Sequence, residues 1–102
     1  MAKHFVVSAG DMKPGSLLQV EVAGEMLCVA RSEKGDFFAI PDSCTHEDYP
    51  LSEGEIWDEC VECPIHGSLF NLRTGEVSGL PAFVPTKSLP VVLEGDDVYV
   101  EL

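Results

Sequence analysis

Two short pairs of metal-binding side chains stand at opposite ends of one stretch of this sequence. Cys44 and His46 form the first pair, Cys63 and His66 form the second, and residues 47–62 separate them. A thiolate is a soft, charged ligand and a neutral imidazole is a borderline one, so two of each can bind zinc or complete an iron-sulfur cluster. The stretch therefore predicts a metal centre built from two loops.

The order of the ligands within each pair favours iron over zinc. Structural zinc sites usually place Cys with Cys and His with His, whereas both pairs here are mixed. A mixed pair suits a rhombic iron-sulfur cluster, because each loop can send its cysteine to one iron and its histidine to the other. A zinc-stabilised interaction module is the alternative from another class.

The complete motif, CxH followed after residues 47–62 by CPxHG, resembles the cluster-binding signature of Rieske proteins. In Rieske centres two histidines replace two cysteines on one iron of a [2Fe-2S] cluster. The resemblance extends to the closing VVLEGDDVYVEL segment, and it is closest to the small ferredoxins of bacterial aromatic-ring-hydroxylating dioxygenase systems. It implies that Cys44 and Cys63 bind one iron of the cluster, and that His46 and His66 bind the other.

Residues beside the ligands agree with that resemblance. Pro64 offers no backbone donor, and Gly67 lets the main chain pass where a Cβ would clash. The segment GLPAFVP, residues 79–85, resembles the stiff proline loop that covers the cluster on a third side in this family. Ordinary turns and a rigid surface loop are the alternative interpretations of these residues.

Two departures from the respiratory and photosynthetic Rieske proteins bear on the reduction potential. Those relatives carry an extra cysteine in each ligand loop, and Tyr49 and Ile65 stand at these positions here, so no disulfide can tie the loops. They also resemble this chain at Ser68 but have a tyrosine where it has Phe70. Hydrogen bonds to cluster or ligand sulfur raise the potential, and Phe70 donates none. We expect a potential near the low end of the Rieske range, roughly −150 mV.

Short apolar runs separated by turn residues predict an all-β protein, a sandwich or a barrel, and the resemblance implies a Rieske-type antiparallel sandwich. The length of 102 residues suits one domain, residues 1–102, and the resemblance adds a small cluster-binding subdomain at about residues 43–85, formed by the two ligand loops and the proline loop. A tight reversal is expected at Gly24-Glu25. The expected strands are His4–Ala9, Leu17–Val22, Met26–Arg31, Phe37–Ile40, Gly54–Trp57, Val61–Cys63, Ser68–Leu72, Lys87–Leu93 and Val98–Leu102.

Charge is the other strong signal. Acidic residues outnumber basic ones 18 to 6, and the formal net charge is −12, which repels nucleic acid and anionic membrane surfaces. We expect an acidic rim that steers the cluster end toward basic patches on redox partners, although a solvated surface explains part of it. Between residues 47 and 62 the sequence has no Lys or Arg, and its acids there are Glu47, Asp48, Glu53, Glu55, Asp58, Glu59 and Glu62.

The remaining cysteines and His4 receive structural interpretations. Cys28 lies in an apolar run and is expected in the core. Cys60 forms a CxxC with Cys63, but Cys63 has the ligand role, and a reducing cytoplasm disfavours a disulfide. His4 is expected on a surface strand.

The resemblance also implies a role. A carrier of this kind takes one electron from an NADH-dependent flavoprotein reductase and passes it to the Rieske centre of a terminal oxygenase, with no catalytic residues of its own. The start MAKHFVVSAG lacks a signal peptide and no run is long enough to span a membrane, so we expect a cytoplasmic monomer. A small Rieske-like subunit of a nitrite reductase and a mono-oxygenase component are the alternatives.

Overall fold

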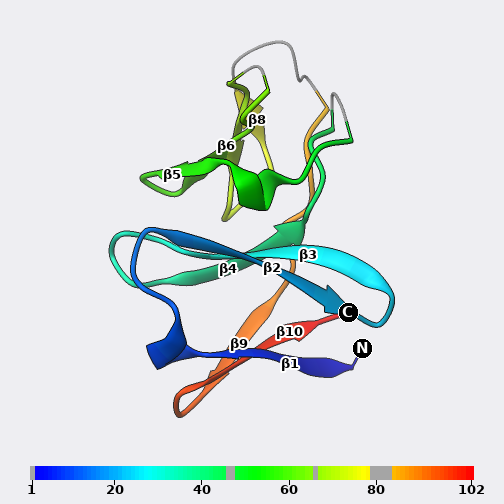
Figure 1. The fold of residues 1–102 in the computed structure, drawn as a ribbon. Helices are drawn as coiled ribbons and strands as arrows, with labels where there is room; N and C mark the ends of the chain where they lie inside the picture. The colour runs from blue at the N-terminus through cyan, green and yellow to red at the C-terminus, as the bar shows by residue number, and fades with distance from the viewer. Residues whose placement is uncertain (1, 46–47, 66, 79–83) are drawn as a thin grey trace.

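Three antiparallel sheets lie one above another along the long axis of the molecule (Figure 1). The computed structural model describes residues 2–45, 48–65, 67–78 and 84–102. Within these ranges two short 3-10 turns, Ala9–Asp11 and Leu51–Glu53, are the only helical elements, and the all-β prediction is confirmed. None of the helical segments in the described ranges has the length and apolar character needed to cross a membrane.

Each sheet is assembled from strands that pair antiparallel with their neighbours. The first sheet has the order β1 (Lys3–Ser8), β10 (Asp97–Glu101), β9 (Val91–Glu94). The middle sheet has the order β2 (Ser16–Val22), β3 (Glu25–Arg31), β4 (Phe37–Pro41). The third sheet has the order β5 (Glu55–Trp57), β6 (Cys60–Glu62), β7 (Leu69–Asn71), β8 (Val77–Ser78).

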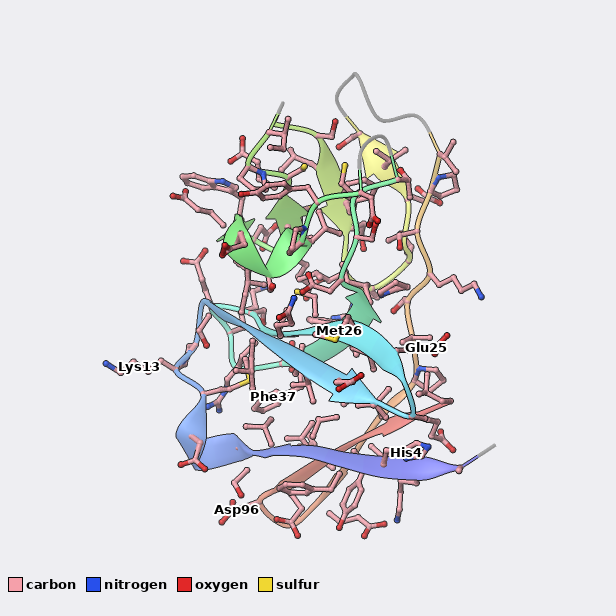
Figure 2. All side chains as sticks on the ribbon, turned by 45° about the vertical axis from the view of Figure 1, so that its right-hand side comes forward. His4, Lys13, Glu25, Met26, Phe37 and Asp96 are labelled. Carbon is pink, nitrogen blue, oxygen red and sulfur yellow. The ribbon has the colours of Figure 1, made fainter. Side chains whose placement is uncertain are left out.

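The middle sheet is buried on both faces, which explains why β3 and β4 contain nearly unbroken apolar runs. Successive side chains of a strand point to opposite faces. Cys28 and Ile40 therefore pack toward the third sheet, and Val29 and Phe37 pack toward the first. Figure 2 shows Phe37 between the middle sheet and β1. The prediction that Cys28 is a core residue is confirmed, since its side chain is fully buried.

One turn prediction needs correction. The reversal between β2 and β3 falls on Ala23-Gly24 and not on Gly24-Glu25, because Glu25 already pairs with Val22. Ala23 and Gly24 have φ values of 51° and 83°, and positive φ at both central residues matches the twist of the flanking strands in a two-residue hairpin.

The expected strand Lys87–Leu93 is also shorter in the structure. Leu89 makes only an isolated bridge with Ala39, and β9 begins at Val91. Pro90 stands between them and has no backbone N–H to donate to a ladder, so regular pairing starts after it. Strand β8 was not predicted, because two residues are too few to show a period. His4 is half-buried on β1, which is less exposed than the predicted surface position (Figure 2).

Candidate metal centre

The two cysteines predicted as ligands begin loops that are closed in the same way. The backbone N–H of Cys44 donates to the carbonyl of Tyr49 at 2.9 Å, and that of Cys63 donates to the carbonyl of Ser68 at 2.8 Å. Each bond joins residues five positions apart, and each predicted histidine falls between the two residues in sequence. His46 and His66 themselves lie outside the described residues. The two predicted ligand segments are therefore closed by the same kind of backbone hydrogen bond.

Both cysteine side chains are buried together. Cys44 is 5% exposed and Cys63 is 2% exposed, and they belong to one core cluster with Phe70. The structure therefore brings together two sequence-predicted ligands from distant parts of the chain. Two thiol groups buried in one cluster and carried by similarly closed loops are a donor set suited to one iron of an iron-sulfur cluster. Phe70 is fully buried in the same cluster, and its ring has no hydrogen-bond donor.

The first loop is anchored by a buried carboxylate that sequence reasoning did not single out. Asp42 follows β4, two residues before Cys44, and is 7% exposed. Its Oδ1 accepts the backbone N–H of Ser52 at 2.7 Å, and its Oδ2 accepts the Ser52 hydroxyl at 2.6 Å and Gln19 Nε2 at 2.8 Å. Asp42 thereby ties the entry of the first loop to β2 and to the 3-10 turn before β5. The sequence feature that could have pointed to Asp42 is its place directly after an apolar strand.

The second loop joins β6 to β7 and is packed tightly against neighbouring backbone. Gly67 has a φ of 81°, a conformation that favours glycine, and its N–H donates to the carbonyl of Cys63 at 3.0 Å. Gly54 passes so close to β6 that a Cβ there would lie 1.9 Å from the carbonyl oxygen of Glu62. Gly67 thus has the turn conformation that was the alternative interpretation, its predicted close approach to a cluster stays a prediction, and Gly54 is a second required glycine that the sequence did not reveal.

The described end of the proline loop is tied to the first ligand loop. Thr45 Oγ1 donates to the carbonyl of Val84 at 2.5 Å. Residues 79–83 of the predicted loop lie outside the described residues, as does Glu47 of the predicted acidic rim. Val84 is 51% exposed and Ile65, in the second loop, is 39% exposed, so apolar side chains flank the ligand segments at the surface.

The predicted acidic rim is exposed over most of its described length. Asp48, Glu53, Glu55 and Asp58 are exposed. Among the described residues, one acid of the rim has a cationic partner, because Arg73 of the turn after β7 binds Glu59 through Nε and Nη2 at 3.1 and 2.8 Å. These hydrogen bonds lower the pKa of Glu59, so the fold supplies a cation that the sequence stretch itself lacks.

The two cysteines outside the predicted ligand set sit in environments that disfavour thiolates. Burial, and then the charge of Asp42, raises the pKa of Cys28. Burial, and then Asp58 and Glu59, raises the pKa of Cys60. Both residues are therefore thiols at neutral pH when no metal is bound, and the thiolate is the form that binds metals.

Comparison with known proteins identifies the family. The model of the Rieske [2Fe-2S] domain matches residues 2–90. The chain belongs to the Rieske [2Fe-2S] family. It is 45% identical over its full length, and over 94% of the relative, to the ferredoxin component of biphenyl 2,3-dioxygenase from Rhodococcus jostii strain RHA1. The Rieske assignment made from the CxH and CPxHG motif is therefore confirmed.

Solved structures agree with the fold. A complex of reduced oxygenase and oxidized ferredoxin in carbazole 1,9a-dioxygenase contains a chain with a TM-score of 0.87 and 37% identity, covering 95% of this chain and 99% of that one. A putative small subunit of a nitrite reductase has a TM-score of 0.85 over all of both chains, but at 20% identity it shows the fold alone. This Rieske chain accordingly carries one [2Fe-2S] cluster and acts as an electron carrier that is not catalytic alone.

Proposed function

We propose that Cys44 and Cys63 bind one iron of the cluster and that His46 and His66 bind the other. The observation that carries this proposal is the matched closure of the two loops, with both thiol groups buried in one core cluster. The cluster supplies a one-electron couple when bound. The chain contributes the frame: Asp42 fixes the entry of the first loop, and the close approach at Gly54 fixes the entry of the second. We further propose a single domain, residues 1–102, with a cluster-binding subdomain at about 43–85.

Electron paramagnetic resonance (EPR) of the dithionite-reduced protein, with iron and zinc analysis, tests the ligand set. A rhombic signal and two irons per chain are expected for the wild type. The variants His46→Cys and His66→Cys should change the g values of the signal, since each replaces an imidazole ligand by a thiolate. Cys60→Ser is the matched control, because its pKa and position disfavour ligation, and it should leave the signal unchanged. Zinc without an EPR signal would instead support the interaction module.

We also propose that the protein serves the terminal oxygenase of an aromatic-ring dioxygenase system and takes electrons from an NADH-dependent flavoprotein reductase. The support is that relatives over the whole chain are named as ferredoxin components of such systems, and that one similar chain is in complex with its oxygenase. The nitrite reductase alternative has less support, because that likeness extends to the fold alone. We place the protein in the cytoplasm as a monomer, with no nucleic-acid or membrane partner.

The exposed rim acids Glu53, Glu55 and Asp58 give the docking proposal its physical basis. Opposite charges on a partner raise the rate of encounter, and salt screens the effect. The assay is stopped-flow reduction of a purified aromatic-ring oxygenase by the reduced carrier over a range of salt concentrations. We expect the second-order rate to fall with salt, and less steeply for Glu55→Gln. A rate independent of salt, or permanent co-purification with one large subunit, would contradict a transient carrier.

A further inference from the structure

One carboxylate of the rim is held in place beside the second ligand loop. Glu62 directly precedes Cys63, and its Oε1 accepts the indole N–H of Trp57 at 2.7 Å. Its other oxygen, Oε2, lies 3.2 Å from the point that a Cβ on Gly67 would occupy. Glu62 therefore spans the loop from the residue before Cys63 to the residue after His66.

The neighbouring strand does not neutralise the charge of the Glu62 carboxylate. Glu62 is directly opposite Glu55 in the β5–β6 ladder, and like charges facing each other across strands are destabilising. Among the described residues no cationic side chain forms an ion pair with either carboxylate. Both acids and Cys63 line the same surface pocket of about 290 Å³. A local arrangement that costs stability commonly marks a functional position.

We propose that Glu62, positioned by Trp57, lowers the reduction potential of the cluster. The reasoning rests on the proposed ligands Cys63 and His66. Reduction adds one negative charge, and a carboxylate fixed next to the ligand loop opposes that charge more strongly than one that turns freely in water. Trp57 is 55% exposed, so burial of its ring contributes little to stability. Its hydrogen bond to Glu62 is the contact that holds the carboxylate beside the loop.

The test is the midpoint potential of Glu62→Gln at pH 7, measured by protein-film voltammetry. Glutamine keeps the shape and an oxygen that accepts the Trp57 N–H, so the substitution removes only the charge. We expect the potential to rise, with a change in the reduction equilibrium of up to about tenfold, which is 59 mV for one electron. Glu55→Gln removes an equal charge across the ladder, where none of the described residues holds the carboxylate by a side-chain hydrogen bond, and should give a smaller rise.

Trp57→Phe tests the position of the Glu62 carboxylate separately from its charge. It retains Glu62 but removes the N–H that holds it, so the potential should rise by less than in Glu62→Gln. The double variant should match Glu62→Gln alone, because the tryptophan acts only through the carboxylate. If Glu62→Gln loses iron, the single variant Trp57→Phe still tests whether the position of the carboxylate affects the potential.

Equal shifts in Glu62→Gln and Glu55→Gln, or no shift in Glu62→Gln, would overturn the proposal, as would an unchanged potential in Trp57→Phe. Iron content and the EPR signal are measured on every sample. Failure of the proposed ligand set would appear in the wild type as a missing rhombic signal, before any potential is compared.

Discussion

Replacing Gly54 by alanine should destabilise the protein strongly, because the added Cβ has no room. That Cβ would lie 1.9 Å from the carbonyl oxygen of Glu62, and a contact of ordinary length needs more than 3 Å. One backbone segment must therefore move by more than 1 Å. Gly54 is hydrogen bonded to Leu51 and Glu62 belongs to the β5–β6 ladder, so neither segment can move without breaking bonds.

The expected cost is about 3 kcal/mol, the upper end for overpacking, because the obstacle is a backbone atom and not the end of a flexible side chain. For a domain of this size each kcal/mol lowers the melting temperature (Tm) by about 4–8 °C, so the Tm should fall by about 12–24 °C. Circular dichroism measures the Tm, and iron analysis after purification reports cluster retention. Since Glu62 precedes Cys63, we expect Gly54→Ala to retain less iron than the wild type.

Gly10→Ala is the matched control for this substitution. Nothing lies within 4 Å of a Cβ at Gly10, and its φ is outside the left-handed region. The control should melt within about 4 °C of the wild type, since surface substitutions away from special features change stability by about 0.5 kcal/mol or less. If Gly54→Ala melts with the control and keeps its iron, the close approach of Gly54 to β6 does not constrain the second loop.

Three further substitutions test other parts of the site. Phe70→Tyr should raise the midpoint potential, because it adds a donor in the core cluster that contains both proposed cysteine ligands. An unchanged potential in voltammetry would count against the low-potential explanation. Burial raises the pKa of Cys28, so above about pH 9 the thiol ionises only in the unfolded chain, and stability should fall by up to about 1.4 kcal/mol per pH unit. The Tm of Cys28→Ala should fall less than that of the wild type between pH 8 and 10, and equal losses would contradict this. Thr45→Val removes the bond to Val84, worth about 1 kcal/mol, and should release iron to a chelator faster than the control Thr74→Val; equal rates would show that this tie does not protect the cluster.

The sequence predicted the metal chemistry better than the surroundings of the metal site. Ligand types and spacing are local, so the motif predicted Cys44 and Cys63 as ligands, and burial of both in one cluster agrees with that prediction. Gly54 and Asp42 act through partners at Glu62, Ser52 and Gln19, and no local pattern encodes those contacts.

Strands, too, were predicted well where the signal in the sequence is clear and poorly where it is not. The apolar runs of β3 and β4 predicted strands correctly, because a sheet buried on both faces leaves a continuous signal. The hairpin turn was displaced by one residue, since Ala23 gave no sign that it adopts a positive φ. The start of β9 was predicted too early, because Pro90 lacks the N–H that a ladder needs and regular pairing begins only after it.

The two ligand loops come from different sheets, and this has a consequence for stability. The first loop follows β4 of the middle sheet, and the second joins β6 to β7 of the third sheet. The two sheets meet through the apolar cluster that includes both cysteines. With the proposed ligands, the bound cluster joins the sheets covalently across that contact. Because ligation stabilises only the folded arrangement, iron loss should weaken the docking of the third sheet on the middle sheet as well as the loops themselves.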